Sequence, residues 1–311
     1  MKVLIIPRDG LGDLVLSLPL ASALKKHRPD WEVFYLVSRK QASMTWEHPL
    51  VDGEILMESG LAVYEKARLL RSFRFDIAID LYPSPESALT LALAGIPQRV
   101  GTMYRWFSLL YSHRVKIRKH PSIKHEAKYN LEYLTPLGIS EELERPRLYL
   151  REEEKRWARQ LLRGLPKPVI AINPSSGGTS RNWPFERYRD LADKLKEIGF
   201  GIVITGDRGP EINIGEILDT RGKTSVRELM AILEAVSVLI SSSTGPMHIA
   251  CALDTPTVSL FYPEGVAGPT RWGPLHPRSI VLTSKPGDRN LETTSIDAVV
   301  EAAEKILQSP G

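Results

Sequence analysis

The sequence predicts an α/β protein made of two Rossmann-like, doubly wound domains that face each other across a cleft. Short β-rich runs alternate with amphipathic helical patterns along most of the 311 residues, a rhythm typical of βαβ units around a parallel sheet. The alternation stops once, in a highly charged stretch before residue 168, and then starts again. The length also suits two domains better than a single core. We place the domains at 1–155 and 156–311.

In the first domain, apolar runs rich in β-branched residues predict strands, and amphipathic stretches between them predict helices. One of these helices stops at Gly95, a residue type that commonly ends helices. The predicted strands are 2–7, 32–37, 75–80 and 99–101, and the predicted helices are 13–27, 61–73, 84–95 and 124–138.

In the second domain the same alternation begins with the apolar run "PVIAIN" and continues to the end of the chain. The last predicted helix could pack on either domain. The predicted strands are 168–173, 201–206, 236–240 and 255–261, and the predicted helices are 185–198, 209–218, 225–234, 246–253 and 295–308.

The composition, with 42% apolar and 25% charged residues, is that of a folded globular protein. No stretch reaches the roughly 18 consecutive apolar residues of a membrane helix. The short apolar run before Pro7 favours a first strand over a signal peptide. The single cysteine, Cys251, excludes an internal disulfide and fits a reducing compartment, and its apolar neighbours favour a packed core thiol. We therefore expect a cytoplasmic protein.

Positive charge is concentrated in one segment, although the formal net charge is only +4. Between Arg99 and Lys128, eight Lys or Arg and three His stand against one acidic residue, Glu126, with aromatic and aliphatic residues among them. The segment is a solvated basic face, a nucleic-acid surface, or a surface for anionic lipid at the inner face of the cytoplasmic membrane or for a phosphorylated acceptor. No nucleic-acid-binding signature accompanies it, so nucleic acid ranks last. The candidate contact residues are Arg105, Arg114, Lys116 and Arg118.

Two glycines and an aspartate follow the first predicted strand, in "PRDGLGDLVLSLP". Gly10 and Gly12 form a G-x-G, but the third glycine of a dinucleotide fingerprint is missing, so a nicotinamide enzyme is weakly supported. The glycines instead let the backbone approach a ligand. Asp13 opens the next helix, either as its cap or as a group that faces the ligand.

Hydroxyl groups and glycines crowd the loop "NPSSGGTSRNWPFERY" after the strand 168–173. Such a loop lets backbone N–H groups converge on a phosphate. Arg181 could bind the phosphate oxygens bidentately, with Ser175 and Ser176 beside it. No ATPase-type P-loop is present. The alternative is a plain flexible connection.

A third strand-to-helix junction reads "SSSTGPMHIA" at 241–250. Pro246 suits the first turn of a helix, and Ser243 or Thr244 could cap its N–H groups. The same N–H groups, together with Gly245 and the helix dipole, also form an anion site. His248, on the first turn, would then face the ligand.

Taken together, these motifs resemble the ADP-heptose–lipopolysaccharide heptosyltransferases, glycosyltransferase family 9, which have the GT-B fold. The resemblance rests on "LGDLVLSLPLASALKKHRPD", "NPSSGGTSRNWPFERYRDLADKL", "STGPMHIACALDTPTVSLFYP" and "RWGPLHPRSIVL", in family order over nearly the whole chain. It implies an inverting, metal-independent transferase whose second domain holds an ADP-linked sugar and whose first domain holds a lipopolysaccharide-type or lipid-linked glycan. No D-x-D sequence suggests a metal clamp, and no cofactor is expected.

The resemblance also implies roles for individual residues. Asp13 matches the catalytic base, and Arg181 replaces a lysine that meets the donor diphosphate. The expected donor sugar is heptose or a similar sugar. Ser243 stands where the family commonly has an aspartate toward the donor sugar, and this departure is the reason that heptose is not the only sugar expected. The other donor-side positions carried over are Ser175, Ser176, Glu211, Thr244, Gly245 and His248.

Two other functions remain open at this point. A nucleotide-sugar epimerase could use the same two-domain fold. A non-catalytic protein that binds a sugar nucleotide or a glycan could retain the donor motifs. A transferase remains the leading interpretation, with a nucleotide-diphospho-sugar and a phosphorylated or lipid-linked acceptor as its partners.

Overall fold

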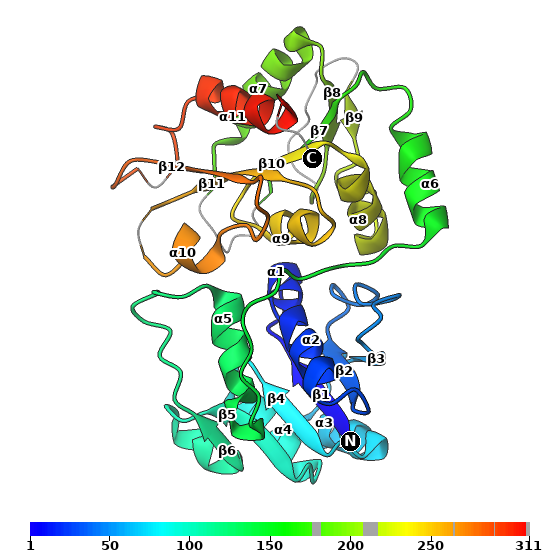
Figure 1. The fold of residues 1–311 in the computed structure, drawn as a ribbon, viewed down its shortest axis with the longest axis vertical. Helices are drawn as coiled ribbons and strands as arrows, with labels where there is room; N and C mark the ends of the chain where they lie inside the picture. The colour runs from blue at the N-terminus through cyan, green and yellow to red at the C-terminus, as the bar shows by residue number, and fades with distance from the viewer. Residues whose placement is uncertain (176–181, 208–216, 264, 289, 309–311) are drawn as a thin grey trace. The chain divides into compact units, whose positions relative to one another are not determined.

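The computed structural model describes residues 1–175, 182–207, 217–263, 265–288 and 290–308. The chain divides into two compact units, Met1–Pro146 and Arg147–Gly311, which are described separately below. Figure 1 shows the order of their elements along the chain.

Unit 1 is built on a six-stranded sheet in the order β3-β2-β1-β4-β5-β6, with every neighbouring pair parallel. The strands are β1 (Lys2–Ile6), β2 (Glu32–Val37), β3 (Gly53–Leu56), β4 (Ile77–Asp80), β5 (Gln98–Thr102) and β6 (His113–Val115). The helices are α1 (Leu11–Val15), α2 (Leu18–His27), α3 (Val63–Phe73), α4 (Pro85–Leu93) and α5 (Glu126–Leu131), with 3₁₀ helices η1 (Trp106–Leu110) and η2 (Glu132–Leu137).

Both faces of this sheet are covered, as parallel sheets require. Leu4 of β1 belongs to a core cluster with Leu70 of α3, Leu91 of α4 and Phe107 of η1. On the opposite face, the Tyr35 hydroxyl donates a hydrogen bond of 2.9 Å to the Ser17 carbonyl at the start of α2. Apolar side chains therefore pack on both faces of the sheet.

The predicted helix 13–27 is wrong as a single element. It is two helices, α1 and α2, with a break at Leu16 and Ser17. Pro19 has no N–H group and lies in the first turn of α2, where the missing N–H costs no helical hydrogen bond. The Ser17 hydroxyl donates 2.6 Å to the Leu14 carbonyl. Asp13 is consequently the third residue of α1 rather than its cap, which is Gly10.

Unit 2 repeats the architecture with the order β12-β11-β10-β7-β8-β9, again with all neighbouring pairs parallel. Its strands are β7 (Val169–Asn173), β8 (Gly201–Ile204), β9 (Leu218–Asp219), β10 (Val238–Ser242), β11 (Thr257–Phe261) and β12 (Ile280–Thr283). Its helices are α6 (Glu152–Leu161), α7 (Phe185–Ile198), α8 (Val226–Ala235), α9 (Gly245–Ala252), α10 (Pro269–Trp272) and α11 (Ile296–Gln308).

Numbered within its own unit, each sheet has the strand order 3-2-1-4-5-6 of a Rossmann fold. This confirms the predicted α/β class with two doubly wound sheets. Helix α11 joins the core of unit 2 through Val299, Ala303 and Ile306. The predicted helix 209–218 lies mostly outside the described residues, and its last residue, Leu218, begins the strand β9. Cys251 is 1% exposed, which confirms the predicted core thiol.

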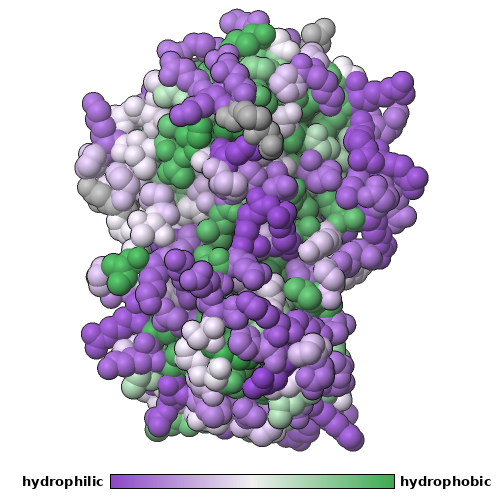
Figure 2. Space-filling view, in the orientation of Figure 1, coloured by the Kyte–Doolittle hydropathy of each residue, from purple (hydrophilic) through white to green (hydrophobic). Residues whose placement is uncertain are grey.

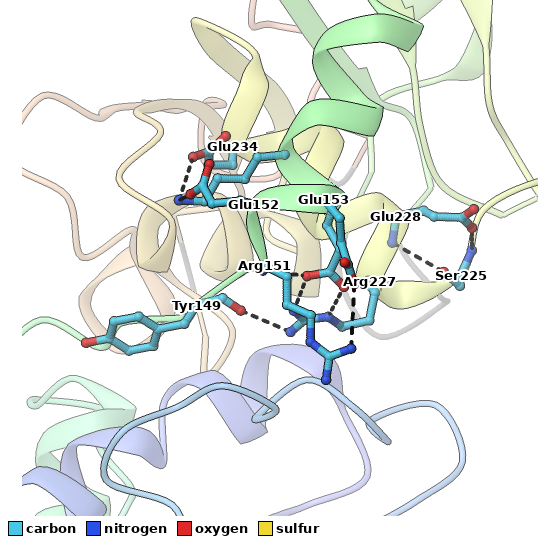
Figure 3. Close-up of polar contacts among 10 residues, drawn as sticks. Tyr149, Arg151, Glu152, Glu153, Ser225, Arg227, Glu228 and Glu234 are labelled. Atoms are coloured by element: carbon cyan, nitrogen blue, oxygen red, sulfur yellow. Dashed lines mark hydrogen bonds and ion pairs between the residues drawn. The ribbon is translucent and has the colours of Figure 1, made fainter.

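Helix α6 is fastened to α8 by a nearly buried arginine, as Figure 3 shows. The Arg227 Nε donates to Glu154 Oε1 at 2.7 Å, and its Nη1 donates to the Tyr149 carbonyl at 3.0 Å. Glu154 also accepts from the Arg151 backbone N–H at 2.7 Å. The segment that opens unit 2 is therefore held by partners within unit 2.

Hydrophilic side chains predominate on the face drawn in Figure 2, and hydrophobic ones form small separate groups there. Within the described ranges, no helix is both long enough and apolar enough to span a bilayer.

Candidate functional site

The strand order identifies where each unit can bind a ligand. In a doubly wound sheet, ligands bind beyond the carboxyl ends of the strands at which the order reverses. In unit 1 these strands are β1 and β4, and in unit 2 they are β7 and β10. Asp13 follows β1, Ser175 follows β7, and Thr244 follows β10. All three predicted positions therefore lie at the switch point of their own sheet.

Asp13 lies directly over Gly10. A Cβ atom built at residue 10 would come within 2.3 Å of Asp13 Oδ2, so only glycine leaves room for this carboxylate. The turn below it is held by Gln41, whose Nε2 donates to the carbonyls of Arg8 (2.7 Å) and Gly10 (2.8 Å). Gly12, which is buried in α1, completes the predicted set at this junction.

The surroundings of Asp13 raise its pKa to about 6. Burial is the largest cause, because desolvation penalises the charged carboxylate. The guanidinium of Arg8 lowers the pKa, the carboxylate of Glu126 raises it, and the ammonium of Lys119 lowers it. Lys119 and Glu126 are themselves paired at 2.6 Å. Asp13 is therefore ionised at neutral pH and still a stronger base than an ordinary aspartate.

A second carboxyl group, Asp80, lies at the end of β4 and was missed by sequence reasoning. It pairs in register with Ile6 of β1 and is 1% exposed. Its Oδ2 accepts from the Tyr111 hydroxyl at 2.7 Å. Burial raises the pKa of Asp80. The acid that closes the apolar run "FDIAID" was the available signal, since a carboxyl group at the end of a buried strand needs a partner or a function.

Arg8 is a further residue that sequence reasoning did not select. Its guanidinium lies 4.6 Å from the centre of the Tyr82 ring. The same positive charge lowers the pKa of Asp13. Tyr82 follows Asp80 at the end of β4 and is 55% exposed. The exposed switch point of unit 1 therefore combines a base, a cation and an aromatic ring, a combination suited to a polar ligand with an apolar face.

In unit 2, Ser175 is held at the switch point by a small polar network. Asn173 Oδ1, at the end of β7, accepts from the backbone N–H and the hydroxyl of Ser175, both at 3.2 Å. The Ser175 hydroxyl accepts from the Asp207 N–H at 3.2 Å. Gly206 (φ +116°) makes this approach possible, because a Cβ there would lie 2.0 Å from Ser175 Oγ.

The junction before α9 has the backbone of a capped helix without the side-chain cap. Thr244 is the N-cap residue (φ −139°, ψ 165°), and its side chain makes no capping hydrogen bond. Its hydroxyl oxygen is buried and has no hydrogen-bond partner among the residues that the structure describes. The cap interpretation is therefore wrong for Thr244. The hydroxyl and the N-terminal N–H groups of α9 are instead arranged to receive an acceptor atom.

The remaining residues of this junction surround the same helix terminus. Ser243 and Gly245 are partly exposed. His248 is 4% exposed, and the centre of its ring is 6.5 Å from that of Trp272 in α10. Behind the junction, Ser242 Oγ donates to Asn182 Oδ1 at 2.6 Å, and the Tyr188 hydroxyl lies 2.8 Å from Ser242 Oγ.

Several predicted residues lie elsewhere. Ser176, Arg181 and Glu211 lie outside the described residues. The basic candidates of unit 1 are all exposed. Arg105 precedes η1, Arg114 lies on β6, and Lys116 and Arg118 lie on the chain after β6. A hollow in unit 2 is lined by residues at the amino ends of β7, β10 and β11, among them Pro168, Ser237 and Pro256. It lies at the edge of the sheet opposite Thr244 and is not part of the candidate site.

Two Rossmann-like units with these switch-point residues define a glycosyltransferase of the GT-B class. The model of glycosyltransferase family 9 (heptosyltransferase) matches residues 63–296. The chain belongs to this family, and it is a glycosyltransferase, as predicted. The family is one of sugar transferases. It therefore favours sugar transfer over the two alternatives, a nucleotide-sugar epimerase and a non-catalytic binding protein.

Individual relatives agree with the family assignment. Lipopolysaccharide heptosyltransferase 2 of Escherichia coli K12 is 27% identical, over 85% of this chain and 83% of that protein. Lipopolysaccharide heptosyltransferase 3 of the same strain is 25% identical, over 95% of each.

Two solved structures share the fold. The family 9 glycosyltransferase of Veillonella parvula DSM 2008 has a TM-score of 0.86 at 22% identity, covering 99% of this chain and 97% of that one. The ADP-heptose lipopolysaccharide heptosyltransferase II of E. coli has a TM-score of 0.83 at 24% identity, covering 99% of both chains.

Proposed function

We propose that this protein transfers heptose, or a closely similar sugar, from an ADP-linked donor to a lipopolysaccharide-type or lipid-linked glycan, with inversion and without a metal ion. The observation that carries the proposal is Asp13, a carboxylate with a pKa of about 6 at the switch point of unit 1. The names of the heptosyltransferase relatives support the heptose donor and the lipopolysaccharide acceptor. An E. coli heptosyltransferase of the same fold has been solved with ADP.

In this proposal Asp13 is the general base. It accepts the proton of an acceptor hydroxyl while that oxygen forms a bond to the anomeric carbon of the donor, and the bond from that carbon to the diphosphate oxygen breaks. A base with a pKa near the working pH combines a high ionised fraction with a strong affinity for the proton. Attack on the face opposite the leaving diphosphate inverts the anomeric centre.

Unit 2 holds the donor. The N–H groups at the start of α9 and the hydroxyl of Thr244 bind diphosphate oxygens. His248 and Arg181, which match diphosphate-binding positions of the family, supply further hydrogen-bond donors. Negative charge develops on the diphosphate as it leaves, and donors fixed in advance stabilise it most effectively. Ser175 is held by Asn173, and the resemblance to the family assigns Ser176 to the same diphosphate and Glu211 to the nucleoside.

Ser243 contacts the donor sugar. A serine at a position where the family commonly has an aspartate still offers one hydroxyl group to a sugar hydroxyl but carries no charge. On the acceptor side, the exposed Arg105, Arg114, Lys116 and Arg118 provide positive charge for a phosphorylated glycan.

The test combines the purified protein with ADP-heptose and heptose-deficient lipopolysaccharide and follows product mass and ADP release. We expect a product heavier by one heptose residue, unaffected by EDTA, with an anomeric configuration opposite to that of the donor. Transfer from a different ADP-sugar alone would retain the transferase and reject heptose. ADP binding without transfer to any acceptor would contradict the proposal.

The pH dependence provides an independent check of the base. We expect kcat/KM to rise with pH up to a plateau, with a midpoint near pH 6, because only the ionised Asp13 accepts a proton. An acidic limb that stays in place in the Asp13→Glu variant, which retains a carboxylate in a different position, would assign the titration to another group.

A further inference from the structure

Unit 1 carries a surface that combines exposed apolar side chains with positive charge. We define this amphipathic face by η1 with the preceding residues 103–105 and by the segment 114–118. Trp106 is 79% exposed and Leu109 is 81% exposed. The neighbouring Met103 and Tyr104 are 44% and 40% exposed. Large apolar side chains at this level of exposure, gathered on one short segment, indicate an interaction surface.

The geometry of η1 aligns its two most exposed residues. In a 3₁₀ helix, side chains three positions apart eclipse each other, so Trp106 and Leu109 project from the same side. The other side of η1 is anchored: Phe107 is 5% exposed, and Leu110 packs against the same core cluster. The Ser108 hydroxyl accepts from the Arg105 N–H at 3.1 Å, which fixes the start of the helix. The apolar pair is therefore presented by a well-supported element.

Positive charge lies beside this pair. Arg114, Lys116 and Arg118 are exposed and alternate with the buried Val115 and Ile117, so the three cations share one side of an extended segment. The Arg118 Nε donates to the Tyr104 hydroxyl at 3.2 Å, which ties the end of this row to the residues before η1.

The strand register places Arg114, and with it the other two cations, on the same side of the sheet as η1. Arg114 pairs with Gly101 of β5, and aligned residues of parallel strands point to the same face. The ring of Tyr111, at the end of η1, covers that face of Gly101, because a Cβ there would come within 2.6 Å of the ring.

Among the residues that the structure describes, no acidic side chain forms an ion pair with Arg105, Arg114, Lys116 or Arg118. The sequence from Arg99 to His125 has no Asp or Glu. The nearest following acids are engaged with other lysines: Glu126 pairs with Lys119, and Glu132 pairs with Lys124, both at 2.6 Å. The cations of the face therefore act outward.

We propose that the amphipathic face docks this protein on the surface of an anionic phospholipid bilayer. Trp106 and Leu109 enter the interface between headgroups and acyl chains, and Arg105, Arg114, Lys116 and Arg118 attract the negative surface. Apolar insertion combined with basic residues is the pattern of peripheral membrane binding. An aliphatic leucine beside the indole favours lipid over nucleic acid, which would call for flat stacking surfaces. The inference goes beyond the proposed function, because it does not depend on which sugar is transferred.

The experiment is flotation of the full chain with vesicles of phosphatidylcholine alone or of phosphatidylcholine mixed with phosphatidylglycerol. We expect binding to the mixed vesicles that weakens as salt rises. The double variant Trp106→Ser/Leu109→Ser should bind at least about tenfold more weakly. Its matched control is Tyr64→Ser/Leu93→Ser, which removes two other exposed apolar side chains of unit 1 (67% and 43% exposed) and should bind as the parent does.

A second pair of variants tests the charge. Arg114→Gln/Lys116→Gln should lose binding to the mixed vesicles, whereas Lys40→Gln/Arg68→Gln, which removes the same charge from exposed positions elsewhere in unit 1, should retain it. The thermal midpoint and ADP affinity of all variants should match the parent, because these side chains are exposed and lie in the unit that does not hold the donor.

Three outcomes would overturn the proposal: no binding to anionic vesicles, equal loss in the test and control pairs, or a change of oligomeric state in Trp106→Ser/Leu109→Ser without a change in vesicle binding. The last would make the face a contact between two copies of the chain. Because flotation requires no sugar transfer, each of these outcomes is distinguishable from a failure of the proposed activity.

Discussion

At the scale of single residues, the position of Asp13 depends on the residue three places before it. The Asp13 carboxylate occupies the space that a side chain at residue 10 would fill. The sequence indicated that glycine here allows a close approach. The group that makes the approach is the aspartate, and only the three-dimensional fold of the turn shows this.

Gly10→Ala tests this arrangement. The added methyl group should displace the carboxylate and lower kcat by at least about tenfold, while the fold persists, since residue 10 has an extended backbone (φ −144°) that alanine adopts readily. Gly164→Ala is the control, because a Cβ there meets nothing within 4 Å. Unchanged kcat in Gly10→Ala would show that the position of Asp13 is not needed.

Asp13→Asn should trade activity for stability. We expect kcat to fall by about 10²–10⁴-fold, the usual contribution of a general base. The pKa of Asp13 is raised on folding, so the folded state binds its proton more tightly than the unfolded state does. The native carboxylate therefore lowers stability progressively as pH rises from about 4 to about 6, and the full penalty remains above this range.

The variant removes that penalty. Its free energy of unfolding should exceed that of the parent by about 1–3 kcal/mol near pH 8 and match it near pH 4. Denaturant unfolding at the two pH values measures the difference. A constant difference at both would mean that the Asp13 carboxyl is not desolvated in the native state.

The same scale shows where sequence reasoning ends. Asp13 stands in a conspicuous glycine-rich turn and was selected. Asp80 stands at the end of an ordinary apolar strand and was not, because its significance arises from burial and from Tyr111, which is distant along the chain. Local patterns carry information about turns and caps, whereas the environment of a buried carboxyl group is set by tertiary contacts.

At the scale of elements, the switch point of unit 2 depends on a close contact between two loops. Gly206, after β8, gives Ser175, after β7, the space that its hydroxyl occupies. The strands β7, β8, β10 and β11 and the helix α7 lie where the sequence predicted them, because long apolar runs and a strong helical period specify them. The strands β3, β6, β9 and β12 were missed. β3 has one buried residue and β12 has none, and β6 and β9 have only three and two residues, too few for a periodic signal.

Gly206→Ala should weaken donor binding through this contact. The new Cβ would push Ser175 away from Asn173, and we expect about a tenfold loss of ADP affinity and about 1–3 kcal/mol of stability. Gly199→Ala is the matched control, because Gly199 also has a positive φ (+104°) but a Cβ there meets nothing within 4 Å. Calorimetric titration with ADP measures both. Equal affinity losses would attribute the effect to backbone strain alone.

At the scale of the whole molecule, the chain is two units of one architecture, each with its own core. The repeated strand order was predictable in kind from the βαβ alternation. The residue at which the second unit begins was harder to predict from the sequence. It is defined by contacts of α6 with α8, because α6 itself is a charged helix with a single buried residue, Ala158.

The anchor of α6 leads to a prediction for fragments. The fragment Arg147–Gly311 should fold and bind ADP, because it contains Arg227 and all of the partners in Figure 3. The fragment that begins at Arg156 lacks Glu154 and should be less stable by about 3–5 kcal/mol, the usual cost of leaving one member of a buried ion pair alone. Thermal unfolding followed by circular dichroism compares the two.

A pair of full-length variants separates this ion pair from a general effect of truncation. Glu154→Gln should lower the thermal midpoint, whereas Glu153→Gln, whose side chain is 68% exposed, should leave it nearly unchanged. Equal midpoints in the two variants would show that the Arg227 contact contributes nothing to stability.

The same anchor has a consequence for recombination among relatives. Because the Tyr149 carbonyl and the Glu154 carboxylate have their partner, Arg227, on α8, we expect the segment that enters unit 2 to be inherited together with that unit. A hybrid enzyme joined after Pro146 exchanges the whole of unit 2, which we propose holds the donor, together with the contacts between α6 and α8. A junction inside α6 would unite an arginine from one parent with a carboxylate from another. Natural or engineered exchange of sugar specificity is therefore expected to succeed at the former junction.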